Sequence, residues 1–312
     1  MEFGAIGRTL LQFRLGALVK QGAGRVPALP DLGASRMPAL PGLAGLAFAL
    51  LLAFGGTSAE AYRVPGRPAQ RPAAARAGGA TVYPEFRSSS GTIRWISDQM
   101  PIKVYISPGL TLDSIIDPQL GAPMTNVDGR DRWPDLVADV VSNPQQFQSL
   151  PVAQGYVPEH YQAALQGINS WKAFERDGLF KFQVVNDPGD ADIYVFWTNH
   201  FVDKLGLGLF QNDIRGYTAK RSFSYKAIMS GKKAQFKPVV TLLRTTEANG
   251  ITMPAGKMKA SAAHEFGHAL GIEGHSPYPS DLMSVYYGRG AISTNDAATI
   301  RYLYHMTPDL IP

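Results

Sequence analysis

The chain has 312 residues, no cysteine and a formal net charge of +5 at pH 7. The lack of cysteine excludes disulfides, thiolate metal sites and a cysteine nucleophile. The positive charge belongs to the N-terminal region, because residues 88–312 carry 20 Lys and Arg against 21 Asp and Glu. We therefore expect no binding of nucleic acid, which requires the folded face itself to be basic.

Residues 1–61 are predicted to be an export segment. Residues 43–54 form an apolar run of signal-peptide length, and Ala59 and Ala61 follow at the spacing of an A-x-A cleavage site. The run is shorter than the roughly 20 apolar residues that a membrane-spanning helix needs. The expected mature protein begins near Tyr62, is secreted or periplasmic, and has no stable membrane insertion. An uncleaved anchor is the alternative.

Two further regions follow the export segment. Residues 62–87 are rich in Pro, Ala and Arg and are predicted to be a flexible linker, because such a composition buries too little apolar surface to offset its ordering entropy. Residues 88–312 are predicted to form one folded domain. Within it, residues 111–156 are rich in Pro, Gly, Asp and Asn, and we interpret them as an insertion that decorates the domain, with one helix near 133–141.

Short runs of β-branched and aromatic residues predict four strands in the domain. They are residues 102–106, 180–185, 193–197 and 238–243. The run 193–197 is nearly all apolar, which is typical of a strand buried on both faces. Residues 199–231 are Gly- and Lys-rich and are expected to include a hairpin of undetermined register.

Apolar residues at helical spacing predict three main helices. They cover residues 158–171, 257–270 and 293–304. Pro158 stands at the first-turn position that proline favours. Gly271 ends the second helix in a left-handed conformation. Ser293 and Asp296 resemble a capping box at the start of the third helix.

The stretch from His264 to His275 carries the chemistry. His264 and His268 lie four residues apart on the predicted helix, so their imidazoles can converge on one ion. Gly271 lets the chain turn, and His275 on the return segment supplies a third ligand, which leaves one tetrahedral position of Zn²⁺ open. Glu265 can take the proton of a zinc-bound water and later give it to the leaving amine.

At these residues the sequence resembles the metzincin superfamily and, within it, the matrixins. HEFGHALGIEGHS and the later DLMS resemble the family's histidine motif and methionine turn. The resemblance covers about residues 90–312 apart from the insertion. It extends to the first predicted helix, the Ala191-Asp192-Ile193 strand and the last helix. It implies an α/β (α+β) zinc-peptidase domain, with a twisted, mostly parallel sheet of four to five strands, three main helices and a substrate cleft above the metal.

The resemblance also implies roles for residues after the third histidine. Met283 is expected to form a packing floor beneath the metal, and Val285, Tyr286 and Tyr287 are expected to line the outer wall of the specificity pocket. One departure concerns spacing: His275 comes one residue later than the usual pattern, and Gly274 occupies the usual ligand position.

Other features of the family are missing from the sequence. The cysteine switch that keeps many matrixins latent is impossible here, and no H-x-D pattern indicates a second zinc. Three other histidines are interpreted as surface or internally hydrogen-bonded groups: His160, His200 and His305. Four loop acids could contribute to a structural Ca²⁺ site, but such acids are more often simply solvated: Asp187, Asp190, Asp192 and Asp213.

The predicted function is that of a zinc-dependent endopeptidase acting on peptide or protein substrates. A thermolysin-type site, the other enzyme alternative, needs a glutamate ligand further along on a second helix. No suitably placed helical acid follows the motif, because the only later acids are Glu273, Asp281, Asp296 and Asp309. An inactive zinc-containing binding protein of the same fold remains the alternative, although such a protein has no need for Glu265. An anchored structural protein leaves the motif unexplained.

Overall fold

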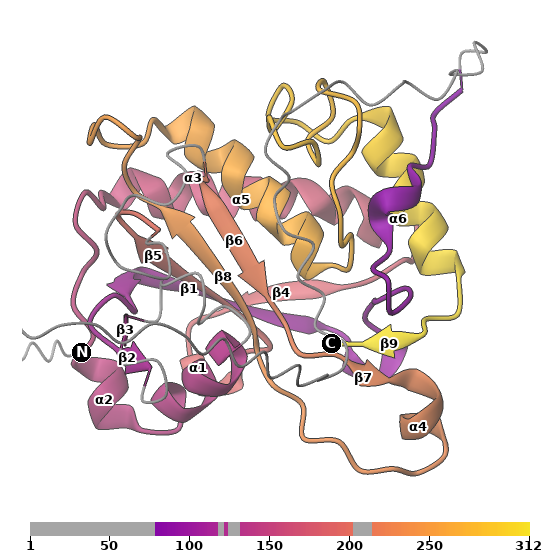
Figure 1. Ribbon diagram of the computed structural model, residues 1–312, viewed down its shortest axis with the longest axis horizontal. Coiled ribbons are helices and arrows are strands. Elements are labelled where there is room, and N and C mark those ends of the chain that lie inside the picture. The colour runs from indigo at the N-terminus through magenta and orange to yellow at the C-terminus, as the bar shows by residue number, and fades with distance from the viewer. Residues whose placement is uncertain (1–78, 118–121, 124–131, 202–213) are drawn as a thin grey trace, which may run out of the picture. The chain divides into compact units, whose positions relative to one another are not determined.

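The structure is a computed structural model that describes residues 79–117, 122–123, 132–201 and 214–312 (Figure 1). The predicted export segment and most of the predicted linker lie outside these residues. None of the helices in the described ranges combines the length and the apolar character needed to cross a bilayer.

The described chain alternates between strands and helices in the pattern of an α/β domain. The strands are β1 (Ile102–Thr111), β2 (Ile116–Asp117), β3 (Ala122–Pro123), β4 (Phe182–Val185), β5 (Ile193–Thr198), β6 (Gly216–Ala219), β7 (Phe223–Ser224), β8 (Val239–Arg244) and β9 (Leu310–Ile311). The α-helices are α1 (Trp133–Val141), α2 (Pro144–Gln148), α3 (Pro158–Asn169), α4 (Tyr225–Met229), α5 (Ala255–Ala269) and α6 (Thr294–His305). Short 3₁₀ turns cover Pro84–Phe86, Ser97–Gln99, Ser170–Glu175 and Pro188–Asp190.

The main sheet has five strands in the order β4-β1-β5-β8-β6. The first four run parallel, and β6 pairs antiparallel with β8 at the edge. The predicted mixed, mostly parallel sheet of four to five strands is therefore confirmed. The strand β6 falls in the region where a hairpin was expected, but it pairs with β8, which lies some twenty residues further along the chain.

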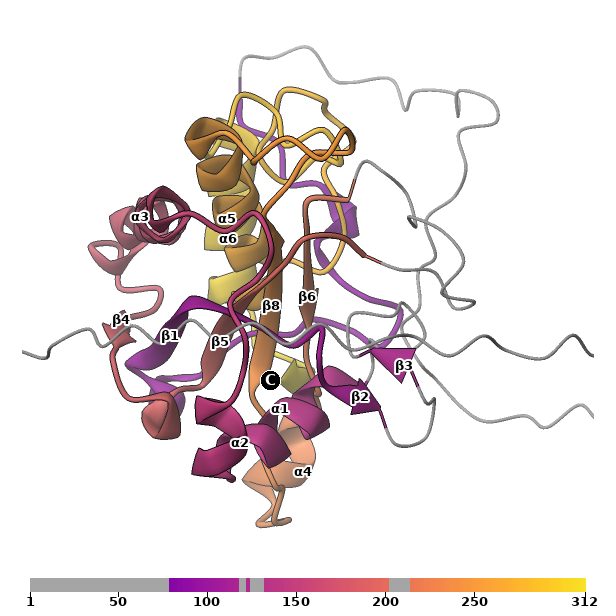
Figure 2. The same ribbon diagram turned by 90° about the vertical axis from the view of Figure 1, so that its left-hand side faces the viewer.

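Alternate residues of the central strands enter two separate cores. In β5, Ile193, Val195 and Trp197 pack into the core beneath α3 and α5. Tyr194 and Phe196 point to the opposite face and pack against residues of α1 and α2. Figure 2 shows α3 and α5 on one side of the sheet and α1 and α2 on the other. All of β5 is buried, as the apolar run predicted.

Two sequence interpretations need correction. The predicted linker extended to residue 87, but Tyr83 and Phe86 are 0% and 1% exposed and belong to the main core, so the folded part begins before Tyr83. The predicted decorating insertion contributes α1 and α2, whose Trp133 and Phe147 bury the second face of the sheet. The local composition did not reveal this, because buried aromatics stand among many turn-forming residues.

Candidate metal centre

Helix α5 is held in the core by its apolar face and by hydrogen bonds to its backbone. Met258, Ala262 and Phe266 are buried in the main core, as the helical spacing predicted. The indole nitrogen of Trp171 donates to the carbonyl oxygen of Ala263 at 2.8 Å. Because Ala263 directly precedes His264, this bond fixes the helix at the start of the histidine motif.

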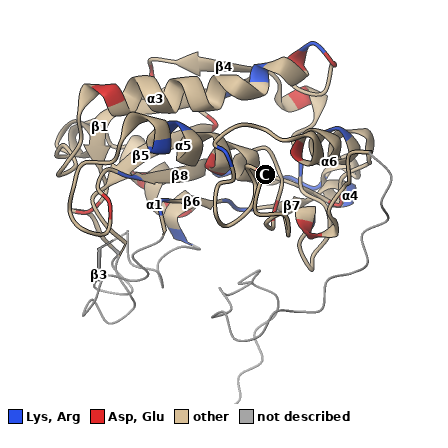
Figure 3. Cartoon of the chain, turned by 90° about the horizontal axis from the view of Figure 1, so that it is seen from above, with Lys and Arg blue, Asp and Glu red and all other residues tan. Residues whose placement is uncertain are grey.

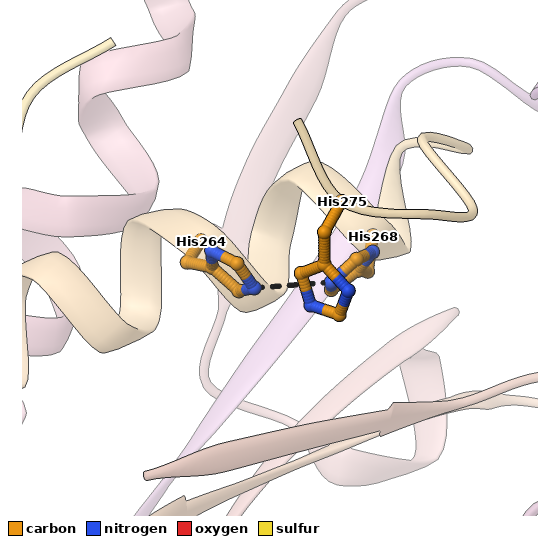
Figure 4. Close-up of side chains that lie close together, drawn as sticks. All are labelled: His264, His268 and His275. Atoms are coloured by element: carbon orange, nitrogen blue, oxygen red, sulfur yellow. Dashed lines mark hydrogen bonds between the residues drawn. The ribbon is translucent and has the colours of Figure 1, made fainter. Parts of the chain in front are cut away.

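His264 and His268 meet on one side of α5. Their Nε2 atoms lie 3.1 Å apart, and Figure 4 shows the two rings turned toward a common space. The Nδ1 of His264 is bonded to the carbonyl oxygen of Leu282 at 2.7 Å, and that of His268 to the carbonyl of Ile272 at 2.6 Å. Since only a protonated Nδ1 can donate to a carbonyl, both Nε2 atoms keep free lone pairs.

His275 comes from the return segment and faces the other two rings (Figure 4). Its ring centroid lies 5.2 Å from that of His264 and 5.0 Å from that of His268. The turn depends on Gly271, whose φ of +116° is readily available only to glycine. Backbone bonds then hold the segment, because the amides of Glu273 and Gly274 donate to the carbonyls of Phe86 and Glu85 at 3.0 and 2.8 Å.

The three histidines form a ligand set that fits a metal. Their ligand atoms lie within 4.8 Å of one another, and they are the only group of three or more His, Cys, Asp or Glu residues of this kind in the described part of the chain. Burial lowers the pKa of His264 to about 3 and that of His268 well below its usual value. Both are therefore neutral at pH 7, as metal ligands must be. Two nitrogens bound tetrahedrally to zinc lie about 3.3 Å apart, close to the separation found here.

Glu265 is buried next to the triad. Its Oε2 accepts a hydrogen bond from Thr218 Oγ1 of β6 at 2.9 Å, which leaves Oε1 for a second partner. Burial raises the pKa of the carboxyl to about 8, against the opposing effects of Thr218 and of the nearby Lys220. The Glu265 side chain can occupy this place because residue 216 is glycine. A Cβ on residue 216 would lie 2.5 Å from Glu265 Cγ.

A largely buried ion pair joins the residue that follows β6 to the return segment. Lys220 Nζ lies 2.5 Å from Glu273 Oε1, and the two side chains are only 9% and 17% exposed. The same ammonium donates to the carbonyl oxygen of His268 at 2.6 Å, where α5 ends and the helix dipole favours a cation. The carboxylate of Glu273 therefore pairs with Lys220 and holds the return segment in place.

The methionine turn is fixed from α6. Met283 is 0% exposed, and its backbone amide, with that of Leu282, donates to the carboxylate of Asp296 at 3.3 and 2.9 Å. Asp296 and Ser293 also form the predicted capping box at the start of α6. Asp296 therefore links α6 to the segment 282–283, in which the Leu282 carbonyl accepts from His264.

We expect Asp296→Ala to lower the free energy of unfolding of the metal-free protein by about 3 kcal/mol or more, since several buried N–H groups lose their acceptor at about 1–3 kcal/mol each. Denaturant unfolding followed by circular dichroism measures this. Asp177→Ala is the matched control, because it removes only a surface ion pair with Arg301. Equal losses in the two variants would contradict the role given to Asp296.

The residues after Met283 lie in two different settings. Tyr287 is 8% exposed and its ring centroid lies 4.4 Å from that of His264. Tyr286 is 69% exposed, and both tyrosines line a cavity of about 190 Å³ next to the triad. Val285 is 48% exposed and is not among the residues that line this cavity. A larger cavity of about 350 Å³ contains none of the predicted site residues.

The remaining candidate ligands have other partners. His160 is buried, with Nε2 bonded to the carbonyl of Met253 at 2.8 Å. Asp192 accepts from the amide of Lys103 at 2.7 Å, and Asp190 forms an ion pair with the Lys103 ammonium. Asp213, another of the four loop acids that could contribute to a Ca²⁺ site, lies outside the described residues.

Comparison with known proteins supports the resemblance. The family model described as Matrixin matches residues 157–305, which include the three histidines, Glu265 and Met283. The match supports a matrixin-like metzincin catalytic domain. A search of curated proteins finds no match.

The matrixin-like domain contains site residues that the sequence analysis missed. Thr218 of β6 contacts the acid, and Lys220, directly after β6, contacts the end of the motif helix. No local pattern marks these two residues, because β6 is a four-residue strand far from the motif. The family match supports a zinc-binding metalloprotease with peptide or protein substrates.

Proposed function

We propose that the protein is a zinc-dependent endopeptidase in which His264, His268 and His275 hold the metal and Glu265 is the general base. The observation that supports this most strongly is that three histidines converge beside the buried carboxylate of Glu265, which lies on the same helix as His264 and His268. When bound, zinc would supply a Lewis acid and lower the pKa of a water ligand.

Glu265 is suited to moving a proton. Thr218 orients one carboxylate oxygen, and the other is left for the proton. Burial raises the pKa of the carboxyl, and the positive charge of a bound zinc ion would lower it again, so that the ionised form would be available to accept a proton. The neighbouring Lys220 opposes part of this rise, since its positive charge favours the ionised carboxylate.

The edge of the sheet offers a place for an extended peptide. Within the described residues, β6 is the last strand of the sheet and is paired on one side only, with β8. An exposed edge can add a strand of substrate through backbone hydrogen bonds. Because Thr218 in the middle of β6 contacts Glu265, a peptide aligned there would pass the three histidines.

Zinc dependence tests the proposal directly. We expect the purified protein to cleave a mixed peptide library, to lose that activity with a chelator and to regain it when zinc is restored. Cleavage sites are read by mass spectrometry. A protein that binds one zinc but cleaves no member of the library would favour the alternative, an inactive zinc-containing binding protein.

We also propose that residues 1–61 direct export, with cleavage before Tyr62. The apolar run at 43–54 and the residues Ala59 and Ala61 support this. N-terminal sequencing of the protein recovered from the medium or periplasm is expected to begin near Tyr62. A membrane-bound form that retains Met1 or Met37 would indicate an anchor.

A further inference from the structure

A small cavity adjoins the histidine triad on the side of the first turns of α5. It measures about 190 Å³ and lies between α5, the start of β6 and the segment 286–290. Two of its lining residues place it next to the site. Tyr287 packs on His264, and Ala260 lies one helical turn before that histidine. Ligand pockets for whole small molecules usually measure 300–1,000 Å³. This volume therefore suits a single side chain.

The charged residues that line the cavity, among those that the structure describes, all have the same sign. They are Arg215, Lys257 and Arg289, and none of the described lining residues is acidic. Figure 3 shows that Lys and Arg are otherwise mixed with Asp and Glu over the described elements, so this grouping is local. The first turn of α5 lies at the cavity too, and the positive end of a helix dipole favours an anion.

The two arginines have capacity for a ligand. Lys257 is already paired with Glu247 at 2.7 Å. The Arg215 guanidinium lies 5.1 Å from the centre of the Tyr287 ring, and none of the ion pairs in the described part of the chain involves Arg215 or Arg289. An unpaired guanidinium at a cavity presents a planar set of donors that matches a carboxylate.

We propose that this cavity binds an acidic side chain, glutamate or aspartate, of the peptide substrate, at a residue next to the cleaved bond. The inference rests on the proposed endopeptidase function and adds the chemical class of the substrate. Arg289 and Arg215 would bind the carboxylate through charge-assisted hydrogen bonds. Because Arg215 directly precedes Gly216, which contacts Glu265, an occupied cavity also places the neighbouring peptide bond at the acid.

Matched peptides test the preference. The peptides differ only in carrying Glu, Gln, Leu or Lys at each position that flanks the bond cut in library profiling. We expect kcat/KM to be about tenfold higher for Glu than for Gln at one of these positions, as a hydrogen bond to a charged group implies. The ratio should fall toward one in Arg289→Gln or Arg215→Gln. Arg301→Gln, a surface arginine paired with Asp177, should keep it.

Binding without turnover separates this inference from the proposed function. Fluorescence anisotropy with the zinc-loaded Glu265→Gln variant gives the affinity for the Glu and Gln peptides, and the preference for Glu should weaken with added salt. Charge-dependent binding that the arginine substitutions abolish, without cleavage by the wild type, supports the cavity and contradicts the endopeptidase. Cleavage with no preference for acids, a preference for Leu, or a preference that survives both substitutions overturns the inference and leaves the endopeptidase standing.

Discussion

Glu265→Gln is expected to retain zinc and fold but to lose peptide cleavage by a factor of at least about 10²–10⁴, the usual contribution of a general base. The amide has nearly the same shape, and its carbonyl oxygen can still accept from Thr218, but it cannot take a proton. The substitution also removes a carboxyl from a buried site, so unfolding should not become easier. Single-turnover cleavage of the best library peptide, with zinc content measured in parallel, checks both expectations.

Glu159→Gln provides the control for this substitution. Glu159 is an exposed acid in the first turn of α3, far along the chain from the motif helix. Its replacement should leave turnover unchanged. Wild-type turnover in a zinc-loaded Glu265→Gln protein would rule out Glu265 as the base, even if zinc dependence were retained.

The second large effect is expected for His275→Ala. The affinity for zinc should fall by more than about 100-fold, which exceeds the loss seen when a residue that only orients a ligand is removed. The loss should be as large as in His264→Ala. The reason is geometric: Gly274 in the usual ligand position has no side chain, and Glu273 is held by Lys220. Competition titration with a chelating indicator measures the affinity. In a zinc-bound structure each of the three histidine nitrogens should lie about 2.0–2.1 Å from the metal.

His305→Ala is the matched control, because that histidine lies exposed at the end of α6 and its Nδ1 is bonded to the carbonyl of Arg301. Its zinc affinity should equal that of the wild type. A His275→Ala variant that binds zinc within a few-fold of the wild type would show that the third ligand lies elsewhere. Asp281 would then be the next residue to test, although its carboxylate accepts from Ser276 Oγ at 2.6 Å.

The parts of the fold that are encoded locally could be predicted from the sequence. The runs that became β5 and β8 are apolar apart from Thr198, Thr241 and Arg244, because both faces of these strands are buried. Helix α6 begins at a capping box whose residues are three positions apart, so a short window suffices to find it. The strand β6 could not be placed in this way. Its four residues show no clear alternation, and its pairing with β8 is set by tertiary contacts.

The same distinction holds at the site. His264 and His268 converge because helical spacing dictates it, and Gly271 indicates where the chain turns back. The groups that surround Glu265 come from elsewhere in the chain. Thr218 lies 47 residues before the acid, and nothing in the neighbouring sequence indicates that it will donate to that carboxylate. Arg215 likewise reaches the cavity only because β6 passes along α5.

The backbone bonds between the return segment and the N-terminal residues have a consequence for biogenesis. The carbonyls of Glu85 and Phe86 hold the segment that carries His275, and the amide of Thr92 in turn donates to the carboxylate of Asp309 at 2.9 Å. These contacts span most of the domain in sequence, and contacts of such separation form late in folding. A nascent chain therefore lacks a fully supported triad. The proposed hydrolytic activity should therefore arise only after both ends of the domain have docked.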